Sequence, residues 1–228
     1  LVERAPYGII ASIIPSTNPT STVVNNTISM VSAGNAVIFH PHPGAKKCSC
    51  WTVSLINRAI VGAGGPENLV CAIGNPTMDS AQALMKHPGV RLLVVTGGPA
   101  VVRVAMGSGK KVIAAGPGNP PCVVDETADL AKAGRDIVLG AGFDNNIVCV
   151  CEKEILVVAE VAYQLQSEME RNGGFRLNKK QMEEVTRLVI DEPGGPGREG
   201  KPRKEWVGKN AHLIAREIGL SVPESTRI

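Results

Sequence analysis

The stretch GIIASIIPSTNPTSTVVNNTISMVSAGNAVIFH, residues 8–40, decides the fold class of this chain. Residues 8–15 form a short apolar run that is rich in Ile and ends at Pro15, a pattern typical of a buried strand. Residues 20–33 then place Val and Ile at helical spacing, and Gly34 ends the predicted helix. Residues 36–39 are apolar again. Strand, helix and strand in this order predict a βαβ unit, in which the two strands lie parallel.

The same alternation continues to residue 114. Further helices are predicted over residues 46–61, 78–86 and 99–106, and further strands over residues 69–73, 91–95 and 111–114. These strands are continuous apolar runs, which is typical of a sheet that helices cover on both faces. We therefore expect an α/β fold with a Rossmann-like parallel sheet.

The sequence GPGNPP at residues 116–121 interrupts this alternation. Neither a helix nor a central strand tolerates so many Gly and Pro residues, so a loop and a domain boundary are predicted there. We expect a nucleotide-type domain over residues 1–116 and a cysteine-bearing α/β domain over residues 117–228. In the second domain the pattern predicts strands, helices and one exposed or disordered loop: strands 122–124 and 154–158, helices 128–139, 161–170, 179–190 and 206–218, and loop 191–204.

Composition excludes several classes of protein. The 228 residues include 43% hydrophobic residues, which is enough for a buried core and excludes general disorder. Aromatic residues make up only 3% and the net charge is +3, so a nucleic-acid partner is not expected. The apolar runs are far shorter than the roughly 20 residues of a membrane-spanning helix, so no membrane partner is expected either.

The six cysteines are expected to be free thiols in a reducing cytoplasm, because a chain of this length needs no disulfides for its stability. Zinc sites usually separate paired cysteines by two residues or more, whereas the pairs at residues 48 and 50 and at residues 149 and 151 are separated by one. The four histidines do not cluster in the sequence. We therefore expect no metal site.

Two segments stand out as candidate sites. Thr96-Gly97-Gly98 joins a predicted strand to a helix that starts with proline, so it either binds a phosphate group through helix amides or is a structural turn. In the second segment, residues 143–151, an extended backbone would place Cys149 and Cys151 on the same face. The alternative for these two cysteines is a buried pair that acts as small apolar side chains.

Six motifs, taken in order, resemble the aldehyde dehydrogenase superfamily, and four further details resemble its CoA-acylating branch. The first set is PYG (6–8), PSTNP (15–19), GNAVIFHP (34–41), VTGG (95–98), GPGNPP (116–121) and FDNNIVC (143–149). Those that resemble the acylating branch are FHPHP (39–43) with ALMKHP (83–88), VDETAD (124–129) and EKE (152–154). The resemblance spans residues 6–227, so it is more specific than any single motif.

The resemblance implies roles for individual residues. Cys149 would be the nucleophile that adds to the aldehyde carbon, and Asn18 would hold the developing oxyanion together with the backbone N–H of Cys149. NAD would take up the hydride, and CoA would be a co-substrate. The residues expected to contact the nicotinamide cofactor are Ser16, Thr17, His40, Pro41, His42, Thr96, Gly97, Gly98, Val101 and Gly116.

One departure from the family pattern separates two reactions. Hydrolytic aldehyde dehydrogenases have a glutamate that activates water in the slot that falls here on Ala115. Alanine cannot accept a proton, whereas the thiol of CoA is a good nucleophile without such a base. The resemblance therefore implies acyl-CoA as the product of a short-chain aldehyde. The alternatives are a hydrolytic enzyme that makes a carboxylic acid, and a non-catalytic nucleotide-binding module.

Two other departures leave questions open. His40 stands where many hydrolytic relatives have a lysine near the adenosine ribose, so the preference for NAD over NADP has no ribose-binding acid to support it. Cys151 is an additional thiol, either a spectator or the partner of Cys149 in an oxidised state.

The resemblance also implies a larger context. The chain would be the central part of a longer protein, with the start of the cofactor domain and the end of the catalytic domain outside it. The complete protein would be a homo-oligomer, either a dimer or a tetramer, that binds a small aldehyde and CoA. Its expected location is the cytoplasm, either free or inside a bacterial microcompartment.

Overall fold

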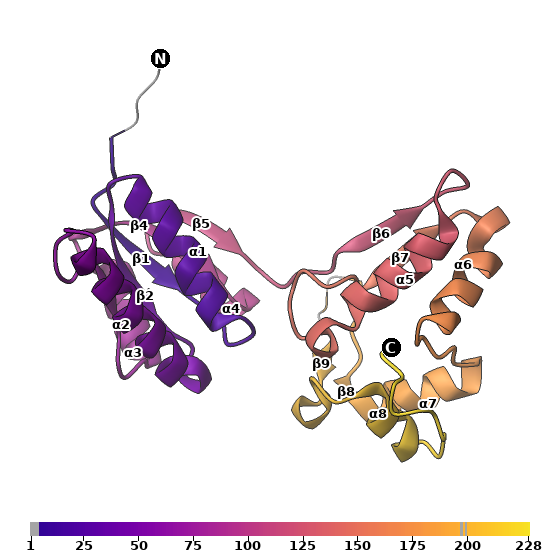
Figure 1. The fold of residues 1–228 in the computed structure, drawn as a ribbon. Helices are drawn as coiled ribbons and strands as arrows, with labels where there is room; N and C mark the ends of the chain where they lie inside the picture. Colours follow the sequence, from indigo (N-terminus) through magenta and orange to yellow (C-terminus); the bar gives the residue numbers. More distant parts are fainter. Residues whose placement is uncertain (1–4, 197, 199) are drawn as a thin grey trace. The chain divides into compact units, whose positions relative to one another are not determined.

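The computed structural model describes residues 5–196, 198 and 200–228. Its contacts divide the chain between Pro117 and Gly118 into two compact units (Figure 1). Each unit has its own hydrophobic core, and each is described by itself below. Whether the first unit binds a cofactor and the second carries the catalytic residues stays a prediction at this point.

The first unit is built around a parallel sheet in the order β3-β2-β1-β4-β5. All neighbouring strands in it are parallel, as the alternation of strands and helices predicts. The strands are β1 (Ile9–Ile13), β2 (Ala36–His40), β3 (Val70–Ala72), β4 (Val90–Thr96) and β5 (Lys111–Ala115). The predicted α/β fold with a parallel sheet is confirmed.

Helices cover both faces of this sheet, which explains why its strands are apolar along their whole length. On one face, side chains of α1 and α2 pack with Ile10, Val37 and Phe39. On the other face, side chains of α3 and α4 pack with Leu93 and Val95. The helices are α1 (Pro19–Ser32), α2 (Lys46–Gly62), α3 (Met78–Lys86) and α4 (Pro99–Met106), with a 3-10 turn at Pro43–Ala45 before α2.

The strand order reverses between β1 and β4, which are neighbours in the sheet but far apart in the sequence. The chain leaves β1 for a helix on one face and leaves β4 for a helix on the other face. In open α/β sheets, ligands bind in the crevice that such a reversal creates at the carboxyl ends of the strands. The fold therefore marks the loops after β1 and β4 as the place for a ligand in this unit.

The second unit has a smaller parallel sheet of β6 (Pro121–Val124) and β7 (Glu154–Val157). Helices α5 (Leu130–Ala141) and α6 (Ala159–Arg171) cover one face, and Val124, Ile137 and Leu165 form the core between them. A 3-10 turn at Phe143–Asn146 follows α5. Helices α7 (Lys179–Val189) and α8 (Ala211–Glu217) complete the unit.

The predicted loop over residues 191–204 is partly wrong. Two short antiparallel strands, β8 (Ile190–Glu192) and β9 (Lys201–Pro202), pair across it. Lys201 also forms ion pairs with Asp191 and Glu192 across the two strands, both at 3.2 Å. Residues 197 and 199 of this stretch lie outside the described residues.

The helix predicted over residues 206–218 is shorter in the structure. Only Ala211–Glu217 is α-helical, and a separate 3-10 turn covers Lys204–Trp206. Gly208 lies between them with a φ of +76°, a left-handed conformation that breaks a helix.

Gly134 sets the distance between α5 and α6, and its replacement provides a test of this packing. A Cβ at this position would lie 2.6 Å from Glu168 Cβ and 2.9 Å from the carbonyl carbon of Glu168. The Gly134→Ala variant is therefore expected to lose about 1–3 kcal/mol of unfolding free energy, because the helices must move apart.

Chemical denaturation of this variant measures the loss. Gly62→Ala in α2 is the matched control, since a Cβ there meets nothing within 4 Å and the helix gains about 0.5–1 kcal/mol. An equal effect of the two substitutions would contradict the close packing of α5 on α6.

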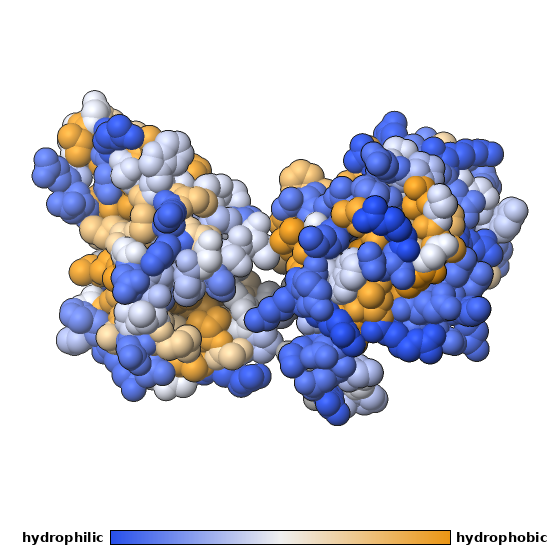
Figure 2. All heavy atoms as spheres, turned by 90° about the horizontal axis from the view of Figure 1, so that it is seen from below, coloured by the Kyte–Doolittle hydropathy of each residue, from blue (hydrophilic) through white to orange (hydrophobic). Residues whose placement is uncertain are grey.

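Apolar side chains remain at the surface of both units, as the orange spheres among hydrophilic residues in Figure 2 show. On the β6–β7 pair, Val123 lies opposite Leu156, and these residues are 74% and 56% exposed.

Within the described residues, every helix is too short or too polar to span a bilayer.

Candidate active site

The loops after β1 and β4 begin side by side at the carboxyl edge of the first sheet. Ile13 at the end of β1 is the register partner of Val95 in β4. The loop that contains Ser16 and Thr17 therefore starts at the same level of the sheet as the turn that contains Thr96. The topology brings these three predicted cofactor-binding residues to one edge, where the strand order reverses.

The turn between β4 and α4 leaves its backbone open to a ligand. Gly98 is the N-cap of α4, and a Cβ on it would meet nothing within 4 Å. Gly97 is closer to the protein, because a Cβ on it would lie 2.8 Å from Val101 Cγ1. Pro99 has no N–H at the first helical position, and the next amides at the start of a helix have no partner within the helix. Such amides bind anions such as phosphate groups.

Asn18 is the N-cap of α1 and is half-buried. Its backbone carbonyl accepts hydrogen bonds from Thr22 N at 3.1 Å, Thr22 Oγ1 at 2.8 Å and Ser21 Oγ at 3.1 Å, so the backbone position is well fixed. Its side-chain oxygen accepts from Thr17 Oγ1 at 3.1 Å, and it caps no backbone amide of the helix. The Asn18 Nδ2 amide therefore has its donors available for another group.

The end of β2 presents its three predicted residues in different ways. His40 is buried, with its Nε2 atom 2.8 Å from Ser80 Oγ, and Pro41 is buried beside it. Burial lowers the pKa of His40 from its usual value, so the ring is neutral at pH 7. The His42 side chain is exposed and accepts a hydrogen bond from Gly44 N at 3.1 Å. Of the two histidine rings, that of His42 is the one that faces solvent.

Ala115 ends β5 and is exposed, with Gly116 next to it. Ala115 is the register partner of Thr96, and its carbonyl accepts a hydrogen bond from Gly97 N at 3.1 Å. The position that the resemblance matches to a water-activating glutamate therefore lies at the same sheet edge as the candidate cofactor loops, and its side chain is only a methyl group.

The backbone around Cys149 differs from the prediction. The segment is a turn and not extended, because Cys151 N donates a hydrogen bond to Val148 O at 3.2 Å. The two cysteines of this turn also differ in burial. Cys151 is only 3% exposed, with its Sγ 3.5 Å from Phe143 O, whereas Cys149 is half-buried. The predicted extended backbone is wrong, and so is the alternative of a fully buried pair, because only Cys151 is buried.

A run of left-handed residues leads into this turn. Asp144, Asn145 and Asn146 have φ angles of 48°, 49° and 62°. This conformation costs an ordinary L-residue roughly 1–2 kcal/mol, and Asn and Asp tolerate it best. Side-chain amides hold it in place, since Asn145 donates to Gly208 O at 3.0 Å and Asn146 donates to Ala141 O at 2.7 Å.

Gly118 is a residue of this site that the sequence does not reveal. A Cβ on Gly118 would lie 2.3 Å from the carbonyl oxygen of Cys149 and 3.3 Å from its Cβ. The GPGNPP loop therefore passes directly over the backbone of Cys149, and only glycine leaves room for this contact. Lys153 is a second such residue, with its ammonium group among the carbonyls of the same turn. In the sequence, Gly118 occurs in the GPGNPP motif and Lys153 in the EKE motif. These motifs mark the two residues as part of the family pattern, but they do not say what either residue contacts.

The Cys149 turn provides a thiol and an adjacent amide donor. Within the described residues, no backbone carbonyl accepts a hydrogen bond from the N–H of Cys149. A half-buried thiol beside a free amide is suited to nucleophilic attack on a carbonyl group and to stabilisation of the resulting oxyanion. Cys149 and Asn18 belong to different units, so each is placed only within its own unit.

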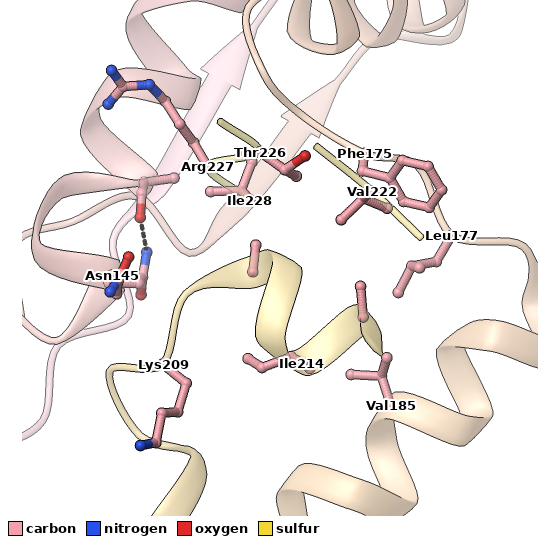
Figure 3. Close-up of a pocket in the computed structure, with 14 residues that line it drawn as sticks. Asn145, Phe175, Leu177, Val185, Lys209, Ile214, Val222, Thr226, Arg227 and Ile228 are labelled. Atoms are coloured by element: carbon pink, nitrogen blue, oxygen red, sulfur yellow. Dashed lines mark hydrogen bonds between the residues drawn. The ribbon is translucent and has the colours of Figure 1, made fainter. Parts of the chain in front are cut away.

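A separate apolar cavity of about 260 Å³ lies in the second unit. Figure 3 shows Phe175, Leu177 and Val222 on one side of it, with Ile214 from α8 and Val185 from α7 facing the same space. None of the residues predicted to be catalytic or cofactor-binding lines this cavity.

In the part of the chain that the structure describes, no group of three or more His, Cys, Asp or Glu side chains is arranged to hold a metal ion.

Comparison with known proteins places these features in a family context. The family model described as "Aldehyde dehydrogenase family" matches residues 1–175. The chain is 52% identical over 232 residues to the acetaldehyde dehydrogenase (acetylating) EutE of Escherichia coli, covering 100% of this chain and 49% of that protein. It therefore spans about half the length of this relative.

Solved structures are similar along nearly the whole chain. A Rhodopseudomonas palustris propionaldehyde dehydrogenase, solved with bound CoA and an acylated cysteine, is 45% identical with a TM-score of 0.88. A propionaldehyde dehydrogenase from the Clostridium phytofermentans fucose utilisation bacterial microcompartment is 43% identical, also with a TM-score of 0.88. Each comparison covers 98% of this chain and 50% of the other.

Proposed function

The chain belongs to the aldehyde dehydrogenase family, and we propose that it supplies the cofactor-binding edge and the nucleophile of a CoA-acylating aldehyde dehydrogenase. The proposed reaction converts a short-chain aldehyde, NAD⁺ and CoA to acyl-CoA, NADH and a proton, and it is reversible. In this proposal residues 1–116 are the NAD-binding domain and residues 117–228 the catalytic domain. The chain spans about half the length of its relative, so the reaction is proposed for the whole protein.

The carboxyl edge of the first sheet supports NAD binding. Gly98 leaves open space at the start of α4, and the helix amides that follow Pro99 are suited to a pyrophosphate group. Ser16 and Thr17 follow β1 at the same edge of the sheet, where the strand order reverses between β1 and β4. His40 contributes through its backbone, since its side chain is bound to Ser80, while His42 contributes an exposed ring. Bound NAD⁺ supplies the hydride acceptor for the reaction.

Cys149 carries the acyl group in the proposed mechanism. Its thiolate forms a C–S bond to the aldehyde carbon, and the carbonyl π electrons move to oxygen. In this proposal the N–H of Cys149 donates to the oxyanion, and the family resemblance assigns the same role to the Nδ2 amide of Asn18. Loss of hydride from the same carbon leaves a thioester on Cys149. The thiolate of CoA then attacks this thioester, the bond to Cys149 breaks, and the Cys149 thiolate is regenerated.

Ala115 is the observation that favours transfer to CoA over hydrolysis. It lies exposed at the end of β5, where its methyl group cannot accept a proton from water. A positioned general base contributes about 10²–10⁴-fold to such a step, and a thiolate does not require it. The acylated cysteine and bound CoA of the Rhodopseudomonas palustris structure support the same assignment.

Omission of CoA tests this proposal on the whole protein. Without CoA, we expect a burst of about one equivalent of NADH per active site, followed by a steady rate at least about 10²-fold lower than with CoA. Stopped-flow absorbance of NADH and chromatography of the products measure both quantities. Formation of carboxylic acid at the full rate without CoA would identify the hydrolytic reaction, and no NADH under any condition would favour a nucleotide-binding module.

The proposal extends to assembly and location. We expect a homo-oligomer, a dimer or a tetramer, in the cytoplasm or in a bacterial microcompartment. The microcompartment origin of the similar Clostridium phytofermentans enzyme supports the second location. Light scattering of the purified protein measures its oligomeric state.

A further inference from the structure

We infer that Lys153 is a positioning residue, whose ammonium group holds the Cys149 turn in its reactive conformation. This inference rests on the proposed function, in which Cys149 is the nucleophile. Lys153 lies just before β7, four residues after Cys149. Its side chain reaches back toward the turn, where it meets several oxygen atoms.

The residues that Lys153 contacts lie before and after Cys149 in the sequence. The ammonium group donates to Asn146 O and to Val148 O, both at 3.3 Å, and to Cys151 O at 3.5 Å. It also donates to the side-chain oxygen of Asn146. These acceptors lie on both sides of Cys149, so a single cation closes the segment into a loop.

The acceptors require a positive charge at this point. The negative ends of the Asn146, Val148 and Cys151 carbonyls converge on one place, and without a cation they would repel one another. Lys153 forms no ion pair with a carboxylate within the described residues, so these carbonyls are its partners. Hydrogen bonds from a charged donor are about twice as strong as neutral ones.

The same residue also fixes the loop that covers the nucleophile. The backbone N–H of Lys153 donates to Pro120 O at 3.1 Å. Next to it, Asn119 Nδ2 donates to Glu154 Oε1 at 2.5 Å. Because Gly118 lies against the carbonyl of Cys149, these two bonds set the position of the covering loop. Lys153 therefore connects the Cys149 turn with the loop that contains Gly118 and Pro120.

Three properties of variants of the whole protein test this role. Lys153→Met is expected to lower kcat about 10- to 30-fold, while KM for NAD⁺ changes less than about twofold, because the cofactor site lies in the other unit. Alkylation of Cys149 by iodoacetamide, followed by mass spectrometry of its peptide, is expected to slow by a similar factor. Lys132→Met is the matched control, since Lys132 is an exposed lysine that pairs with Asp136 in the same unit, and its expected effect is below twofold.

Chemical rescue separates positioning from folding. The Lys153→Ala variant is expected to regain at least about threefold in kcat with added propylammonium, which restores the charge, and to gain nothing from propanol. A wild-type kcat for Lys153→Met would overturn the inference. A loss of activity that propylammonium does not reverse, with a lowered Tm, would also overturn it, because Lys153 would then only support the fold.

A second variant distinguishes failure of this inference from failure of the proposed function. If Cys149→Ala is inactive while Lys153→Met is fully active, only the role of Lys153 is wrong. If Cys149→Ala retains full activity, the proposed nucleophile is wrong, and the inference falls with it.

Discussion

Replacement of Cys149 by alanine is expected to lower kcat at least about 10³-fold while the cofactor still binds. The reason is chemical, since alanine cannot form the covalent thiohemiacetal from which hydride leaves, and the free aldehyde is a poor hydride donor. Steady-state NADH formation by the whole protein measures the loss. Fluorescence titration with NADH measures cofactor binding, which the first unit provides in our proposal.

The matched control is Cys151→Ala, two residues further along the same turn. Cys151 is 3% exposed and its Sγ lies against Phe143 O, so the substitution removes a small buried contact. We expect kcat to stay within about threefold of the wild type, with a modest loss of stability. Equal losses for the two variants would mean that Cys149 is not the distinct nucleophile.

The second large effect is expected at Gly118, a residue that takes no part in the chemistry. In Gly118→Ala the new Cβ would lie 2.3 Å from the Cys149 carbonyl oxygen, far inside van der Waals contact, so the turn or the covering loop has to move. A displacement of about 1 Å at a reacting group can cost about 10²-fold in rate. We therefore expect kcat to fall about 10²-fold, with a smaller change in KM for NAD⁺.

Gly74→Ala controls for the general effect of adding a methyl group to a loop glycine. A Cβ at Gly74 meets nothing within 4 Å, and the residue is exposed, so less than a twofold change in kcat is expected. The rate of Cys149 alkylation, measured by mass spectrometry, reports the position of the thiol without substrate. An active Gly118→Ala enzyme with a normal alkylation rate would contradict the contact between this loop and the nucleophile.

The fold of the first unit follows closely from the sequence because its signals are local. Buried parallel strands are continuous apolar runs, and the glycines and prolines between them mark where each element ends. The helix starting at Pro99 and the strand starting at Lys111 have the predicted first residues. The order of strands in the sheet is not visible in such runs, because it depends on which faces the helices cover.

The Cys149 turn could not be predicted in the same way, because distant contacts determine its shape. Asn145 donates to Asn210, 65 residues away in the sequence, and this bond helps to hold the left-handed run before the turn. An apolar segment with alternating cysteines fits an extended strand equally well when such bonds are unknown. The sequence indicates Gly118 only as part of a loop, since its contact with Cys149 spans 31 residues and leaves no local pattern.

The left-handed run at Asp144, Asn145 and Asn146 also limits how this protein can change over generations. A β-branched or bulky residue at any of these three positions would oppose the backbone, so drift there is restricted to Asn, Asp and Gly. Val150, which is 72% exposed on the following turn, carries no such restriction. Neutral substitutions should therefore accumulate at exposed positions of the turn, while the three residues that shape it remain Asn, Asp or Gly.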